Sequence, residues 1–214
     1  MNNVNILWQT RVVTLRPYHH GDLGPALVDA ALDVVESDGI AALTLRDLTR
    51  TVGVSASAAY RHFPSRDHLV AEVSQRARQQ LATALIEARS EVTNSGPRSG
   101  RALRRFAAIG KGYVRFAIEE PRLFEAAFVH CPVRPSTPDD PDAWGVLVGA
   151  IDDMADTGAI PAERRADAPI IAWSGVYGLA MILTRSIRPP DLPPTDADVA
   201  LIDSVVQGII RSLR

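Results

Sequence analysis

Residues 43–69, LTLRDLTRTVGVSASAAYRHFPSRDHL, contain the pattern that decides the fold of this 214-residue chain. Thr44 with Asp47 three residues later is typical of a helix start, because a Ser or Thr side chain can cap the first free backbone amides. The apolar side chains that follow recur at helical spacing, at Leu45, Leu48 and Val52. This periodicity predicts a short amphipathic helix that packs against a core.

The same stretch predicts a second short helix and the start of a third. Gly53 can take the left-handed backbone conformation that ends the first helix. Ser55 can cap the second helix, on which Ala59 and Phe63 face inward. Pro64-Ser65 then closes that helix and caps the next one, because proline cannot continue a helix. Two short helices joined by a glycine-containing turn are typical of a helix-turn-helix.

The outward side of the second predicted helix carries groups suited to DNA. Ala56–Ala58 are small, so the helix start could approach base edges, where methyl groups can contact thymine and a hydroxyl can donate or accept. Tyr60, Arg61 and His62 could each hold a phosphate, and Arg66 follows in the first turn of the next helix. The alternative is that Tyr60 and His62 only pack and that the arginines are solvated, but the whole constellation favours DNA binding.

At these residues the sequence resembles the TetR (tetracycline-repressor-like) family of bacterial transcription regulators. The motifs that carry the resemblance are Leu43-Thr44 through Arg46-Asp47-Leu48, Gly53-Val54-Ser55, and Tyr60 through Ser65. The resemblance implies DNA contacts at Thr44, Arg46, Ser55, Ser57, Tyr60, Arg61, His62 and Arg66, and we add Ala58 for its methyl group.

The sequence departs from the family pattern at three of these positions. Arg66 replaces the usual lysine, which keeps the charge and adds a fork of donors. Many relatives have longer base-reading side chains where Ala56 and Ala58 stand. We therefore expect sequence specificity to depend on methyl contacts and DNA shape as well as on hydrogen bonds.

Composition limits the class of protein. The net charge is −2, with 46% hydrophobic and 22% charged residues, which fits a globular regulator and not a histone-like coating protein. Cys131 is the only cysteine, so we expect no intrachain disulfide and a reducing cytoplasm. The sequence shows no signal peptide and no apolar run of membrane-spanning length, so we expect no membrane partner.

Hydrophobic periodicity predicts an all-α fold with a small N-terminal helix-turn-helix domain and a larger helical body. We expect a flexible arm over 1–22, a DNA-binding domain over 23–70, and a ligand-binding and dimerisation domain over 71–214. In the arm, Arg11 and Arg16 could touch DNA or have no role, and Tyr18–Asp22 lacks the spacing of a metal site. The predicted helices cover about 25–37, 66–92, 101–119, a short piece from Pro121, 142–157, 162–187, and a last helix after Thr195, with loops over 94–100, 131–141 and 188–194.

Part of the body carries a second resemblance, to a TetR branch with a WHG-type C-terminal domain. Its segments are Tyr113–Ala117, Glu120–Phe124, Trp173 and Tyr177–Ala180, with Tyr177 in place of the usual histidine. The resemblance implies a homodimer and an inducer pocket. Small and aliphatic residues on the last two helices fit a four-helix dimer seam, and they include Gly175, Gly178, Ile182, Val199, Ile202, Val206 and Ile209.

Small-ligand pockets are lined by large apolar side chains with a few polar groups. We expect such a pocket in this body, with an apolar or aromatic inducer. The candidates are Phe106, Tyr113, Phe116, Phe124, Phe128, Trp144, Trp173, Tyr177 and Met181. Taken one at a time, each is also explained by core packing.

The function expected from these patterns is a repressor that binds a palindromic double-stranded operator as a homodimer and is released by a small molecule. A body that only binds other proteins is an open alternative. An enzyme is the remote one, because no nucleophile elbow, phosphate loop or zinc motif occurs and His130-Cys131 is better explained as a bystander. We expect no cofactor, no metal and no catalytic residue.

Overall fold

The computed structural model describes residues 23–129, 142–187 and 195–214. The predicted arm with Arg11, Arg16 and Tyr18–Asp22 lies outside the described residues. So do His130-Cys131 and the two predicted loops over 131–141 and 188–194.

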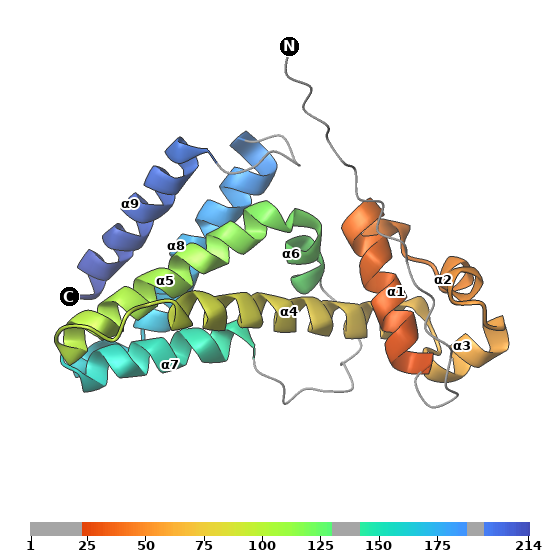
Figure 1. Cartoon of the computed structure of the whole chain (residues 1–214), viewed down its shortest axis with the longest axis horizontal. Coiled ribbons are helices and arrows are strands. Elements are labelled where there is room, and N and C mark those ends of the chain that lie inside the picture. Colours follow the sequence, from red (N-terminus) through yellow and green to blue (C-terminus); the bar gives the residue numbers. More distant parts are fainter. Residues whose placement is uncertain (1–22, 130–141, 188–194) are drawn as a thin grey trace, which may run out of the picture.

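The described residues form helices and turns and contain no strand, which confirms the all-α prediction (Figure 1). In chain order the elements are α1 (Leu23–Asp38), η1 (Ile40–Ala42), α2 (Leu45–Val52), α3 (Ala56–His62), α4 (Arg66–Ser90), α5 (Arg98–Glu119), α6 (Pro121–Ala127), α7 (Ala143–Asp156), η2 (Ala162–Arg165), α8 (Ala168–Ile182), η3 (Leu183–Ile187) and α9 (Asp196–Leu213).

The first three helices form a compact head in which α1 packs against α2 and α3. The predicted helix ends are confirmed by their caps. Thr44 Oγ1 accepts from the Asp47 amide at 3.2 Å, and Gly53 ends α2 with φ of 75°. Ser55 Oγ accepts from the Ala58 amide at 3.2 Å. Local capping chemistry therefore sets the angle between α2 and α3.

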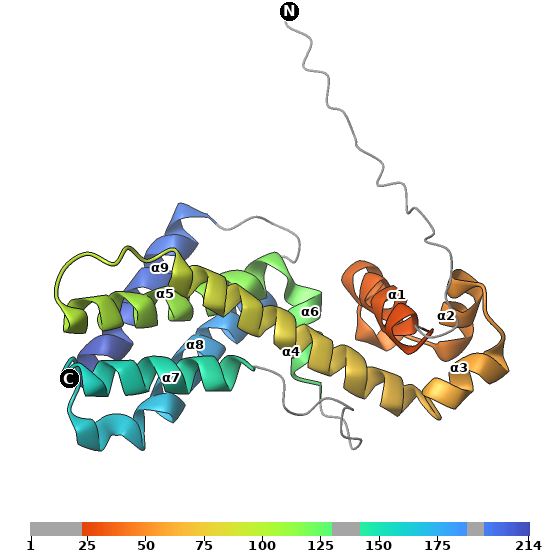
Figure 2. The ribbon, with the colours of Figure 1, turned by 60° about the horizontal axis from the view of Figure 1, so that its bottom comes forward.

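Helix α4 connects the head to the body. It begins beside α3 and runs from the head into the body, so the predicted boundary between residues 70 and 71 falls inside one continuous helix (Figure 2). Its first turns contact α1, while its later turns contact α5, α6 and α7. A displacement of α4 in the body would thus be carried directly to the head.

The body is a layered bundle in which α5 lies centrally and contacts α4, α7, α8 and α9. Helix α6 lies between the body and the head and contacts α1 as well as α4 (Figure 1). The last helix starts at the Thr195 cap, where a reciprocal capping box with Asp198 forms. This confirms the predicted start of α9.

Two predicted helix ranges were wrong. The helix expected over 162–187 is divided into a 3₁₀ turn, α8 and a π-helical end. Proline has no amide to donate and fits only the first turn of a helix, and Pro169 accordingly lies in the first turn of α8. Helix α5 begins at Arg98, three residues earlier than expected, directly after Pro97.

Candidate nucleic-acid interface and ligand cavity

The head presents the predicted DNA-contacting groups along α3 and the turn before it. Ser57 is exposed near the start of α3, and its Oγ lies 3.1 Å from Ser55 Oγ. Ser55 is engaged as the helix cap, which leaves Ser57 as the hydroxyl that faces outward. A short polar side chain at the start of a recognition helix can reach base edges.

The end of α3 carries the phosphate-binding candidates. Tyr60 is 52% exposed, and Arg61 and His62 are exposed beside it. Arg46, on α2, is also exposed. Within the described residues neither Arg46 nor Arg61 forms an ion pair, whereas Arg50 on α2 pairs with Asp47 at 3.2 Å. Exposed guanidinium groups without an ion-pair partner suit the binding of DNA phosphates.

Two predicted contact residues have structural roles that the sequence did not indicate. The Arg66 guanidinium donates from Nε to Leu43 O at 2.9 Å and from Nη2 to Ile40 O at 2.8 Å. It therefore fastens the start of α4 to the segment before α2. Ala58 is half-buried and packs against the core, so its methyl group is only partly available.

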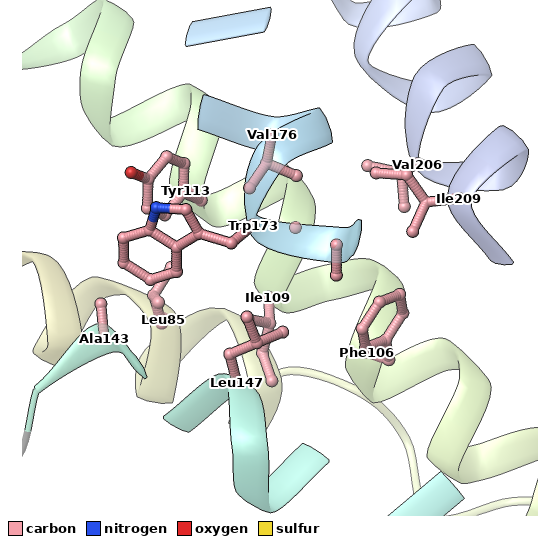
Figure 3. A pocket seen from close by; sticks show the side chains of 12 residues that line it. Leu85, Phe106, Ile109, Tyr113, Ala143, Leu147, Trp173, Val176, Val206 and Ile209 are labelled. Carbon is pink, nitrogen blue, oxygen red and sulfur yellow. The ribbon is translucent and has the colours of Figure 1, made fainter. Parts of the chain in front are cut away.

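The body contains a small cavity of about 20 Å³ between α4, α5, α7, α8 and α9 (Figure 3). Its lining is almost entirely hydrocarbon and comprises Leu85, Phe106, Ile109, Gly110, Tyr113, Ala143, Leu147, Ala172, Trp173, Val176, Val206 and Ile209. A second, larger pocket of about 440 Å³ lies between α6 and the end of α8. We call these two hollows the inner cavity and the α6–α8 pocket.

The predicted pocket residues divide between the two hollows. Phe106, Tyr113 and Trp173 line the inner cavity. Phe124, Phe128, Tyr177 and Met181 line the α6–α8 pocket. Phe116 is buried in the core and Trp144 is 42% exposed, and neither lines either hollow.

Aromatic rings separate the two hollows. The Tyr113 ring meets Phe124 and Trp173 edge-on, with ring centres 5.6 and 5.3 Å apart. Phe128 meets Phe124 at 5.0 Å and Tyr177 at 5.5 Å. Trp144 extends this group through a 5.6 Å contact with Trp173. The rings thus form one continuous group of contacts, with some rings lining the inner cavity and others lining the α6–α8 pocket.

Sequence reasoning missed the aliphatic half of the inner cavity, such as Leu85, Leu147 and Val206, and no signal distinguishes these residues from ordinary core. It also missed the charged rim of the α6–α8 pocket, where Arg185 pairs with Glu125 at 3.1 Å. In the described residues no group of three or more His, Cys, Asp or Glu side chains could hold a metal ion.

Two models of protein families match this chain, one in the head and one in the body. Residues 27–73 match the model of bacterial regulatory proteins of the tetR family, and residues 106–208 match the model of a tetracyclin repressor-like C-terminal domain. The chain belongs to the TetR family. The first match falls on the DNA-binding head and the second on most of the body after α4, so this TetR-family protein is a DNA-binding transcription regulator and not an enzyme.

Solved structures share the fold of this TetR-family protein. A protein with unknown function from Rhodococcus sp. RHA1 is 27% identical with a TM-score of 0.70, covering 92% of this chain and 98% of its own. The regulator PfmR from Thermus thermophilus is 18% identical with a TM-score of 0.55, covering 88% of this chain and 98% of its own.

A TetR variant from Acinetobacter baumannii AYE, solved in complex with minocycline, is 17% identical with a TM-score of 0.56, covering 88% of this chain and 94% of its own. A search of curated protein sequences found no match.

Proposed function

We propose that this TetR-family protein is a cytoplasmic repressor that binds a palindromic operator as a homodimer and is released by a small, apolar or aromatic ligand. The observation that carries the proposal is the cluster of exposed cationic and phenolic groups around α3, on a head joined by α4 to a body with hollows. In this arrangement α3 enters the major groove, Ser57 contacts base edges, and Tyr60, Arg61 and His62 hold phosphates.

The outer face of α8 supports a homodimer. Ile170, Ser174, Gly178 and Ile182 follow one another at four-residue spacing, and none of them is buried. Ile170 is 56% and Ile182 is 47% exposed. A row of aliphatic and small residues permits close helix packing, and a two-fold symmetric pair of heads matches a palindromic operator.

Contacts of α6 support control of the head by a ligand. Arg122 Nη1 donates to Glu36 O at the end of α1 at 3.0 Å, and Arg78 Nη1 on α4 donates to Ala127 O at 3.0 Å. Helix α6 also supplies Phe124 to the α6–α8 pocket. A ligand that displaces this ring would shift α6 and, through its bonds, both α1 and α4.

DNase I footprinting of the DNA that flanks the gene for this protein tests the DNA-binding part of the proposal. We expect one saturable protected region with two inverted half-sites, about one helical turn or a multiple of it apart. Binding that weakens steeply with salt but protects no site would contradict it.

The ligand part is tested with the same footprinted fragment. Small apolar compounds should raise the melting temperature of the protein and release the fragment at the same concentrations. If a broad panel changes neither quantity, the body is better explained as a protein-interaction module.

A further inference from the structure

The Tyr113 hydroxyl is a buried polar group without a partner among the described residues. Tyr113 on α5 is only 2% exposed, and its hydroxyl oxygen forms no hydrogen bond within that part of the chain. Such groups are uncommon, because a buried hydroxyl that has lost its water without gaining a partner raises the free energy of the folded state. Within the described part of the chain, this hydroxyl is therefore free to donate a hydrogen bond to a bound molecule.

Water is a poor candidate for that molecule. The inner cavity is about 20 Å³, room for a single water molecule. A buried water needs two to four polar partners. Apart from Tyr113 and the Trp173 indole, the described side chains that line the cavity are hydrocarbon. Tyr113 and Trp173 supply at most the minimum of two groups, so the site would hold a water only weakly.

The Tyr113 ring lines the inner cavity and also contacts a residue of the α6–α8 pocket. Figure 3 shows the ring at one end of the inner cavity, with its oxygen pointing away from Val206 and Ile209. The same ring contacts Phe124, which lines the α6–α8 pocket. Burial raises the pKa of Tyr113, and its neighbour Tyr177 raises it further, so the group stays a neutral hydrogen-bond donor.

The charged groups nearby are already engaged. Among the described residues, no Lys, Arg, His, Asp or Glu lines the inner cavity. At the rim of the α6–α8 pocket, Arg185 is paired with Glu125, and Arg122 donates to Glu36 O. An anionic ligand beside Tyr113 would lose its hydration without gaining a cation, at a large cost in free energy.

We infer that the ligand is a neutral, largely apolar molecule with a carbonyl-type oxygen that accepts a hydrogen bond from the Tyr113 hydroxyl. It binds among the rings that separate the two hollows, which rotate to admit it from the α6–α8 pocket. This inference rests on the proposed ligand control and specifies the chemical class of the ligand.

The test uses Tyr113→Phe, which removes the hydroxyl and keeps the ring. Ser74→Ala is the matched control, because Ser74 Oγ on α4 is also buried without a partner among the described residues but lines neither hollow. Without ligand, both substitutions should leave the full-length protein at least as thermally stable as the wild type. A lower melting temperature for Tyr113→Phe alone would show that the hydroxyl already has a partner and would overturn the inference.

Three probes of nearly equal shape then separate the ligand classes by calorimetric titration: acetophenone, its hydrocarbon isostere α-methylstyrene, and the anion benzoate. Tyr113→Phe should weaken acetophenone binding by about tenfold, because the carbonyl is then buried without a donor. The same substitution should change α-methylstyrene binding by less than about twofold, and Ser74→Ala should change neither. Benzoate should bind the wild type more weakly than acetophenone.

Each remaining outcome would overturn the inference: equal effects of Tyr113→Phe on the ketone and the hydrocarbon, tighter binding of benzoate than of acetophenone, or binding of none of the probes up to their solubility limits. Release of DNA is measured separately with the footprinted fragment. Tyr113-dependent ketone binding without DNA release would uphold the ligand class and contradict only the ligand control in the proposed function.

Discussion

Arg61 is the residue whose contribution to DNA binding can be measured most directly. It lies at the exposed end of α3 and has no ion-pair partner within the described part of the chain. Arg61→Ala should weaken operator binding at all salt concentrations and reduce the slope of log affinity against log salt by about 1, because one phosphate contact is lost.

Fluorescence anisotropy with a labelled operator across a KCl series measures both effects of Arg61→Ala. Arg98→Ala is the control, since it removes the same charge at the start of α5, a helix of the body that lies away from α3 (Figure 1). Unchanged affinity and slope for Arg61→Ala would remove Arg61 from the interface.

For Arg66 we predict an effect on the free energy of unfolding, because its guanidinium donates to two backbone carbonyls of the head. Lysine keeps the charge but cannot donate to both carbonyls through a planar fork. Arg66→Lys should therefore lower the free energy of unfolding by about 1 kcal/mol, as expected for one lost hydrogen bond. Urea denaturation followed by circular dichroism measures this change.

Arg61→Lys is the matched control for Arg66→Lys, and it should leave the free energy of unfolding unchanged. Equal stability of the two lysine variants would show that the Arg66 bonds contribute nothing to the fold and would favour a purely phosphate-binding role.

At the scale of elements, the starts of α2, α3 and α9 were predictable because each depends on a few neighbouring residues. Thr44, Ser55 and Thr195 cap their helices through side chains that reach amides three residues away. The division of α8 from η2 follows from Pro169 in the same local way and could have been found.

The inner cavity could not be predicted from local patterns. Its lining unites Leu85, Leu147 and Val206 from three helices, and an alternation of apolar residues is the same whether their side chains meet or leave a space. The sequence also does not show which face of α8 packs inside the body and which face is exposed. Gly175 faces α9, where an added Cβ would lie 2.6 Å from Ile209 Cδ1, whereas no described atom lies within 4 Å of a Cβ added to Gly178.

The junction between α5 and α6 gives a pH-dependent prediction. Partial burial and the neighbouring Glu36 and Glu119 carboxylates raise the pKa of Glu120. A carboxyl group with a raised pKa in the folded state stabilises the fold when protonated, and this contribution is lost as the pH rises through that pKa. Ionised Glu120 therefore destabilises the junction at neutral pH.

Glu120→Gln should accordingly increase the free energy of unfolding at pH 7 by a few tenths of a kcal/mol, the usual size for an exposed charge contact. The gain should disappear at about pH 3, where the carboxyl in the unfolded chain is also protonated. Urea denaturation at both pH values measures the difference. Glu87→Gln on α4, away from the junction, serves as the control, and a gain equal at both pH values would contradict the electrostatic explanation.

At the scale of the whole molecule, the C-terminal helices leave an apolar surface uncovered. In the described residues one segment, Ala168–Arg185, is long and apolar enough by composition to cross a membrane, and only 39% of it is buried. Its inner side packs against α5, α7 and α9. Ile170 and Ile182 on α8 and Val199 and Leu201 on α9 remain exposed. A second copy of this chain would cover such a surface and supply the second DNA-binding head.

Gly178→Arg tests this arrangement without disturbing the monomer. Space is free around Gly178 within the described part of the chain, and arginine favours a helix more than glycine does, so the fold should be kept or slightly stabilised. In a dimer packed through α8, two long charged side chains would be buried near the two-fold axis. Sedimentation velocity should therefore show a monomer, and operator affinity should fall because one head binds only one half-site.

Gly149→Arg on α7 is the matched control, because an added Cβ there also meets no described atom within 4 Å. It should leave both the sedimentation coefficient and operator affinity unchanged. If Gly178→Arg sediments as a dimer with full operator affinity, the subunits associate through another surface. If both variants dissociate, the change in net charge, and not the outer face of α8, controls assembly.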